Sequence, residues 1–122
     1  MKTLRRILLG ATAALIATAA LAQGTVPATP VVPLGYCQLT SIDASTLVST
    51  CSGGIPAGAN VALLTPEAQA IRYRDDGTAP TAAVGQPMAV AASLLYTGTL
   101  SKLRVISQTS GAKLNVTFYK SP

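Results

Sequence analysis

Hydrophobic and polar residues alternate in the run that ends the chain. Leu114, Val116 and Phe118 fall on one face of this run, and polar side chains lie between them. A period of two is typical of a strand with one buried and one solvated face. Residues 102–105 alternate in the same way, and a Thr-Ser-Gly segment at 109–111 separates the two runs. The pattern predicts a C-terminal β-hairpin that turns at this segment.

Similar short runs occur throughout the preceding part of the chain. They span residues 36–43, 45–52, 60–64, 68–74 and 88–96. Segments rich in Gly, Pro, Asp and Ser break the chain at 53–58, 75–77 and 97–98. The Ala-rich part at 89–95 also has the propensity of a short helix, but its flanks look like hairpin boundaries and favour a strand. About seven short strands with regular turn signals predict an all-β fold, a small antiparallel β-sandwich or a jelly-roll-like domain.

Residues 1–22 have the pattern of an export signal. Lys2, Arg5 and Arg6 form a positively charged start, an apolar stretch follows, and Ala20-Leu21-Ala22 is a small-x-small cleavage site. The alternatives are an uncleaved anchor and a misassigned start. The apolar stretch is short for a membrane span. Charge, length and cleavage motif together favour a cleaved signal peptide.

A proline-rich segment follows the predicted signal, at residues 23–35. Pro27, Pro30 and Pro33 recur every third residue. Proline fixes φ and favours an extended, polyproline-type conformation. We therefore expect an N-terminal arm or linker outside the core, followed by one β-sandwich domain at 36–122.

Charge is sparse along the whole chain. The chain has nine Lys and Arg residues and four Asp and Glu residues, which gives a net charge of +5. The signal holds three of the basic residues, so six remain against four acids and the exported chain has a net charge of +2. The remaining basic residues are scattered, whereas nucleic-acid binding requires a basic face or stripe. We expect no nucleic-acid partner.

The residue content argues against an enzyme. Without histidine, the chain has no histidine base and no histidine metal ligand. The Gly-x-Ser-x-Gly motif is absent. Ser110 and Lys113 match a Ser-x-x-Lys pattern, but they fall at the predicted hairpin turn, and the companion motifs are missing. We expect no catalytic residue, no cofactor and no metal site.

Cys37 and Cys51 are the two cysteines of the chain. In the oxidising compartment that the signal implies, a structural disulfide is the default. If residues 36–43 and 45–52 form a hairpin around Ala44, the two cysteines lie directly opposite each other. The register also sets Leu39 opposite Ser49 and Ile42 opposite Thr46. A redox pair is disfavoured because no Cys-x-x-Cys motif is present, and a bond between subunits is the main alternative.

The densest group of charges lies between residues 67 and 81. Arg72 and Arg74 fall on one face of a strand, Ile71 and Tyr73 fall on the other, and Asp-Asp-Gly at 75–77 supplies a tight turn. We interpret the segment as a solvated strand end with local Arg–carboxylate pairs. A calcium site needs more oxygen ligands than two adjacent aspartates supply, and adjacent aspartates do not flank a glycosidic bond. The candidate interaction surface consists of Arg72, Arg74, Asp75 and Asp76.

Several segments together resemble a known group of proteins. They are residues 55–59, 67–77, 80–81, 85–88 and 112–116, and the Arg-x-Arg-Asp-Asp-Gly element at 72–77 is the most specific. Over about residues 36–120 the chain resembles small tailed-phage and prophage virion structural proteins of the capsid decoration, head-fibre or tail-associated type. The resemblance implies a non-enzymatic β-sandwich that assembles with copies of itself or with coat proteins. The export signal and the cysteine pair depart from the pattern of that group and put the localisation in doubt.

The sequence thus favours an exported, disulfide-stapled structural protein that forms homo-oligomers. Its location is periplasmic or extracellular, or the virion if the resemblance holds, with no membrane span after cleavage. The alternative is a bacterial periplasmic or surface protein that acts as a ligand-binding or adhesive module, for example for glycans. Such a site requires exposed aromatic side chains with a few polar groups. The candidate aromatic residues are Tyr36, Tyr73, Tyr96 and Tyr119.

Overall fold

The computed structural model describes residues 30–122. The predicted signal at 1–22 and residues 23–29 of the predicted arm lie outside the described residues. The described strands are β1 (Val32–Leu39), β2 (Thr46–Leu47), β3 (Val61–Glu67), β4 (Ile71–Arg74), β5 (Gln86–Met88), β6 (Leu94–Tyr96), β7 (Arg104–Ser107) and β8 (Lys113–Lys120). Two single 3₁₀ turns accompany them, η1 (Val48–Thr50) and η2 (Leu100–Lys102). Within residues 30–122, no helix has the length and apolarity required to span a membrane.

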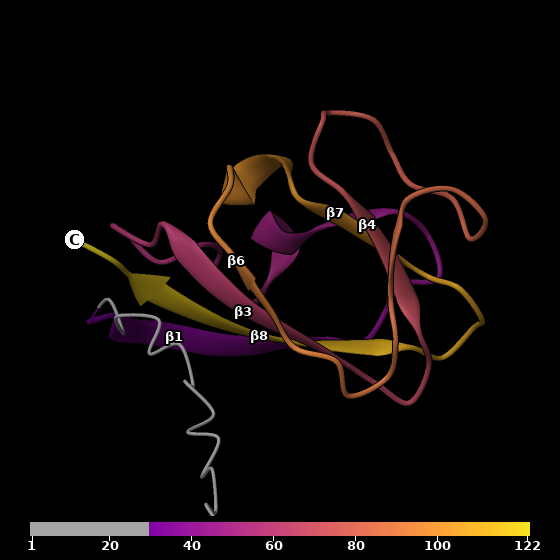
Figure 1. Cartoon of the computed structure of the whole chain (residues 1–122), viewed down its shortest axis with the longest axis horizontal. Helices are drawn as coiled ribbons and strands as arrows, with labels where there is room; N and C mark the ends of the chain where they lie inside the picture. Colours follow the sequence, from indigo (N-terminus) through magenta and orange to yellow (C-terminus); the bar gives the residue numbers. More distant parts are fainter. Residues whose placement is uncertain (1–29) are drawn as a thin grey trace, which may run out of the picture.

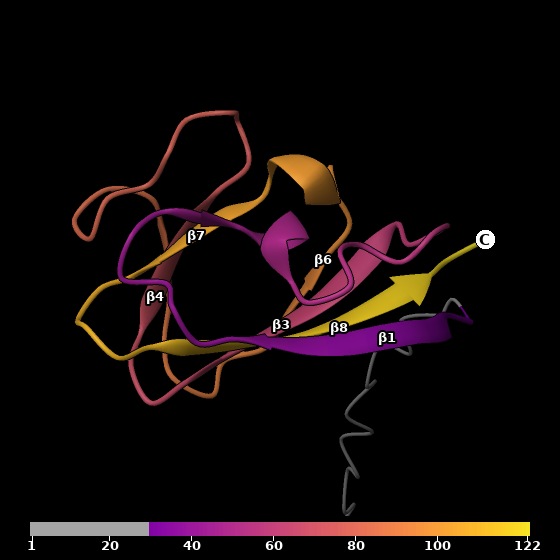
Figure 2. The same cartoon turned by 180° about the vertical axis from the view of Figure 1, so that it is seen from behind.

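The strands form two four-stranded antiparallel sheets (Figures 1 and 2). Sheet I has the order β1-β8-β3-β6 and sheet II has the order β2-β7-β4-β5. The first strand pairs with the last, the second with the seventh, the third with the sixth and the fourth with the fifth. This nesting is a long hairpin wrapped into two sheets, which is the jelly-roll arrangement. The all-β sandwich prediction is confirmed, with eight strands where about seven were expected.

The core lies between the two sheets and follows the predicted alternation. Leu114 and Val116 are fully buried and Phe118 is nearly so, and all three come from the inward face of β8. From the facing sheet, Ile71 on β4 and Val105 on β7 are also fully buried. The inward faces of both sheets meet in one hydrophobic cluster.

Both hairpins expected from the sequence are wrong. β7 pairs with β2 and β4 in sheet II, whereas β8 pairs with β1 and β3 in sheet I, so the turn at 109–111 leads from one sheet to the other. The expected hairpin around Ala44 is also absent, because β1 pairs with β8 and β2 pairs with β7. Alternation shows which face of a strand is buried, but it does not identify the neighbouring strand.

Two expected boundaries are also corrected. β1 begins at Val32, so the last residues of the predicted arm belong to the domain. Pro33 is accommodated because β1 is an edge strand, and the register shifts between Pro33 and Gly35. The expected strand at 88–96 is split between β5 and β6, which lie in different sheets. Ala91 turns the chain between them with a positive φ of 63°.

Candidate functional site

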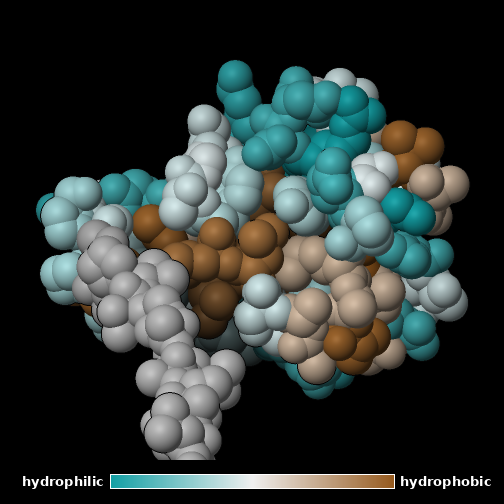
Figure 3. All heavy atoms as spheres, viewed as in Figure 1, coloured by the Kyte–Doolittle hydropathy of each residue, from teal (hydrophilic) through white to brown (hydrophobic). Residues whose placement is uncertain are grey.

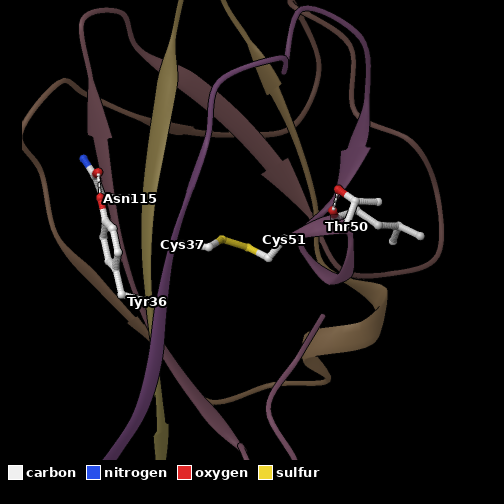
Figure 4. Close-up of a disulfide and its surroundings, with 6 residues drawn as sticks. Tyr36, Cys37, Thr50, Cys51 and Asn115 are labelled. Atoms are coloured by element: carbon white, nitrogen blue, oxygen red, sulfur yellow. Dashed lines mark hydrogen bonds between the residues drawn. A yellow bond between two sulfur atoms is a disulfide. The ribbon is translucent and has the colours of Figure 1, made fainter. Parts of the chain in front are cut away.

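The two cysteines form a disulfide within the chain, so the predicted pairing is confirmed. Cys37 lies on the inward face of β1, and Cys51 directly follows η1 (Figure 4). Their Cα atoms are 5.9 Å apart, and both residues are buried. The sequence predicted that this bond crosses a hairpin, but the structure shows no hairpin there. The bond links the edge strand of sheet I to the segment that leaves the edge strand of sheet II.

The side chain of Arg72, a residue of the candidate interaction surface, is hydrogen-bonded to the loop that follows its own strand. Its Nε donates to the carbonyl oxygen of Ala82 at 3.0 Å, and its Nη1 donates to that of Gly85 at 2.9 Å. Both acceptors belong to the loop at 75–85 that joins β4 to β5. The guanidinium therefore tethers this loop to β4.

Arg74 and Asp76 form an ion pair beside the same loop, as expected for local Arg–carboxylate pairs. Arg74 Nε lies 3.1 Å from Asp76 Oδ1, which also accepts a hydrogen bond from the backbone N–H of Thr78. These bonds, chiefly the one from Arg74, hold the pKa of Asp76 below its usual value. Gly77 completes the predicted turn with a positive φ of 86°.

Asp75 connects the two sheets through a hydrogen bond. Its Oδ2 accepts from the hydroxyl of Tyr96, at 2.9 Å, and Tyr96 lies on β6 in sheet I whereas Asp75 follows β4 in sheet II. Burial of the Tyr96 hydroxyl, together with its bond to Asp75, raises the pKa of Tyr96 to about 12. A Cβ at Gly98 would fall on this hydroxyl, so the close approach of the ring requires glycine there.

Three of the four predicted surface residues line one open hollow of about 410 Å³. Its lining consists of Arg74, Asp75, Asp76, Val84, Gly85 and Gln86. Within residues 30–122, no group of three potential His, Cys, Asp or Glu metal ligands is present. Since each of the four charged residues is bonded within the chain, we assign them first to holding the β4–β5 loop. Their contact with a partner stays a prediction.

A surface that the sequence analysis missed lies at the β5–β6 edge. Residues 77–101 form a run of 25 residues without Asp, Glu, Lys or Arg. Val84, Val90 and Leu95 are 54%, 48% and 55% exposed within it. Figure 3 shows brown residues at the centre of this view and tan and brown residues at its lower right, with hydrophilic residues between these and a brown group at the upper right. We call the exposed residues of this run the uncharged edge; the absence of charge was the signal that could have identified it.

A polar cluster occupies the outer face of sheet I. The Tyr36 hydroxyl donates to Asn115 Oδ1 at 2.6 Å, and Gln38 Nε2 donates to the same oxygen at 3.0 Å. Glu67 Oε2 accepts from Gln38 Nε2 at 3.0 Å and from Asn115 Nδ2 at 3.1 Å. The cluster joins side chains from β1, β8 and β3. Of the four tyrosines, Tyr36 is the exposed one, whereas Tyr96 is buried.

Ser110 of the Ser-x-x-Lys match lies on the connection between β7 and β8, which joins the two sheets rather than forming the expected hairpin turn. The hydroxyl of Ser110 donates to Asp43 Oδ2 at 2.7 Å, and the N–H of Gly111 donates to Asp43 Oδ1 at 3.0 Å. These bonds lower the pKa of Asp43 and fasten the turn to the β1–β2 connection. Lys113 lies on β8, opposite Glu67. Ser110 thus has a structural role in this turn.

Comparisons with known proteins identify no relative of this chain. No family model matches it, and no curated protein or solved structure matches it either. The resemblance to virion proteins stays a prediction. A jelly roll by itself hosts many unrelated functions.

Proposed function

We propose that the protein is a non-enzymatic structural protein of the virion decoration or tail-associated type, which packs against copies of itself through the uncharged edge. The observation that carries the proposal is this edge, a continuous run of residues without charge that leaves Val84, Val90 and Leu95 about half exposed. Exposed apolar side chains that gather on one surface commonly mark a protein–protein contact.

The lack of charge favours a second copy as the partner. In a two-fold symmetric contact the same patch lies on both subunits, so a charge near the axis faces an identical charge. The ten charged residues that follow the predicted signal all lie outside 77–101. Arg74, Asp75 and Asp76 border the run beside Val84, but Arg74 and Asp76 neutralise each other as an ion pair, so little like-charge repulsion opposes the contact. Burial of its apolar side chains contributes about 25 cal/mol per Å² removed from water.

Two further features support this class of function. The jelly roll is an architecture that viral capsid proteins and lectins share. The Cys37–Cys51 disulfide suits an oxidising compartment outside the cytoplasm, in line with the predicted export signal. We infer that the protein acts after export, on a virion or on a bacterial surface.

Sedimentation of the exported chain, Gln23 to Pro122, tests the proposal. We expect a dimer or larger assembly that dissociates on dilution. Val84→Glu should give a monomer, because the substitution places like charges in the contact. The matched control is Val32→Glu, since Val32 is 57% exposed but lies on β1, outside the uncharged edge. This variant should assemble like the wild type.

Two variants with opposite charges at the same position extend this experiment. Val84→Glu and Val84→Lys should each be monomeric, with an unchanged β-type circular dichroism spectrum, and should associate when mixed. A wild-type chain that stays monomeric at every concentration would overturn the proposal. So would assembly of Val84→Glu that matches that of Val32→Glu.

A further inference from the structure

The outer face of sheet I carries a second arrangement, which adjoins the uncharged edge where the Thr65 hydroxyl lies 3.1 Å from that of Ser93. The strand register aligns Gln38 with Asn115 and Asn115 with Thr65, so one polar row crosses three strands. Adjacent strands are about 4.8 Å apart, so the row is about 10 Å wide. Tyr36 lies two residues before Gln38 on the same face. Together the residues form a platform that is open to solvent, defined as Tyr36, Gln38, Glu67, Lys113 and Asn115.

The ring of Tyr36 is the exposed aromatic surface of this platform. The side chain is 61% exposed, yet its hydroxyl is fixed by the 2.6 Å bond to Asn115. Figure 4 shows the ring beside Asn115, on the side of β1 away from the disulfide. An aromatic side chain that is already held in place loses little conformational entropy when a ligand covers it.

The hydrogen-bond inventory shows what a ligand has to supply. Both amide hydrogens of Gln38 are donated, to Glu67 and Asn115, and those of Asn115 go to Glu67 and the carbonyl oxygen of Thr65. The Tyr36 hydroxyl hydrogen is also used. Within residues 30–122, Gln38 Oε1 and Glu67 Oε1 receive no hydrogen bond. The platform therefore presents acceptors beside an aromatic ring, and its ligand brings donors.

Charge distinguishes between the ligands that bring donors. Glu67 alone would favour an organic cation over the Tyr36 ring. Lys113, however, lies directly opposite Glu67 in the strand register, on the same outward face. The platform therefore has no net charge, and the Lys113 ammonium adds donors to the acceptors. A surface of this kind suits a neutral molecule with many hydroxyl groups and an apolar C–H face.

We propose that this platform binds a neutral glycan. The C–H face of a pyranose ring stacks on Tyr36, and its hydroxyl groups donate to Gln38 Oε1 and Glu67 Oε1 and accept from Lys113. The site does not depend on the self-packing proposed above, because the two surfaces share no residue. A glycan on Tyr36 and a second copy on Val84 would thus contact different residues of the chain.

A titration followed by NMR tests this site on the exported chain. The probes are cellohexaose, maltohexaose and chitohexaose, with spermidine as a cationic comparison. With at least one hexasaccharide, we expect amide shifts confined to residues 36–38, 65–67 and 113–117. Tyr36→Ala should weaken binding by about tenfold, since the stacking surface is lost. Tyr36→Phe should retain most of the affinity because the ring remains.

Two controls separate the outcomes. Tyr119→Ala removes a half-buried tyrosine from the same face of β8, outside the platform, and should bind like the wild type. Val84→Glu, the monomeric variant, should also bind like the wild type, which distinguishes this site from the uncharged edge. Three results would overturn the proposal: no shift with any hexasaccharide, equal binding by Tyr36→Ala, or shifts at the platform with spermidine alone.

Discussion

The two edges of the sandwich are closed by different means. At one edge, β1 of sheet I is linked to the segment after β2 of sheet II by the buried Cys37–Cys51 disulfide. At the opposite edge, β6 and β5 are connected by the chain at 89–93 and by the bond from Tyr96 to Asp75. The first edge is closed by a covalent bond within the core. The second depends on a few polar contacts beside an exposed run of uncharged residues.

The two edges therefore contribute differently: the disulfide edge stabilises the fold, and the β5–β6 edge offers a surface for interaction. A covalent link limits the unfolded chain and stabilises the fold without using any surface. The other edge keeps its apolar side chains about half exposed, which costs stability in the isolated chain and offers surface to a partner. We infer that the disulfide edge maintains the sandwich and that the β5–β6 edge is free to form contacts. The predictions below test this division.

Loss of the disulfide should have the largest effect. Closure of a loop of this length, with the cysteines 14 residues apart, contributes roughly 3 kcal/mol in the chain-entropy model. Urea unfolding of Cys37→Ser/Cys51→Ser should show a decrease of about that size relative to the oxidised wild type. Wild type unfolded in dithiothreitol should match the double variant. Equal stability with and without the bond would contradict the role assigned to this edge.

Loss of the Tyr96 hydroxyl should have the next largest effect. Tyr96→Phe removes a bond to a carboxylate, which costs about 1.5 kcal/mol. The substitution also changes how the free energy of unfolding depends on pH. Because the folded pKa is raised from 10 to about 12, the wild type is fully stabilised below pH 10 and loses stability as the pH rises from 10 to 12. Between pH 10 and pH 12, the free energy of unfolding of Tyr96→Phe should therefore decrease less than that of the wild type.

Two further variants test the reason for that effect. Gly98→Ala places a Cβ against the Tyr96 hydroxyl and should reproduce both the destabilisation and the flatter pH profile. Tyr119→Phe removes a hydroxyl that has no hydrogen-bond partner within residues 30–122, and should leave the profile unchanged. If Tyr96→Phe and the wild type lose stability equally between pH 10 and 12, the Tyr96–Asp75 bond does not have the assigned role.

Removal of the Arg72 tether should have the smallest effect. Arg72→Met keeps the apolar stem but frees the carbonyls of Ala82 and Gly85, at a cost of about 1 kcal/mol. Hydrogen exchange of the amides at 81–85 should become faster. Arg74→Met, which breaks an ion pair at the surface, should change this exchange less. Equal protection in both variants would show that Arg72 does not hold the loop.

The interpretation of single strands from sequence was more successful than that of their pairing. The buried face of β8 and the tight turn at Gly77 were both predicted from local pattern. The Cys37–Cys51 pairing was also predicted, but for a reason that the structure does not support, since the bond joins two sheets rather than two strands of a hairpin. The tether from Arg72 to Gly85 was not foreseeable, because it depends on how a loop of eleven residues folds back over its own strand.

The sequence by itself determined which face of a strand is buried, where tight turns form and that the two cysteines are able to form a disulfide. These features depend mainly on residues that are close together in the chain or on the chemistry of the side chain itself. Strand partners were decided by the tertiary structure alone. Among the strands of residues 30–122, only β4 and β5 are neighbours both in the chain and in a sheet. Every other pair joins distant segments, and their choice depends on burying both inward faces at once. For the same reason, only the folded chain brings Tyr36 to Asn115 and places the uncharged residues along one edge.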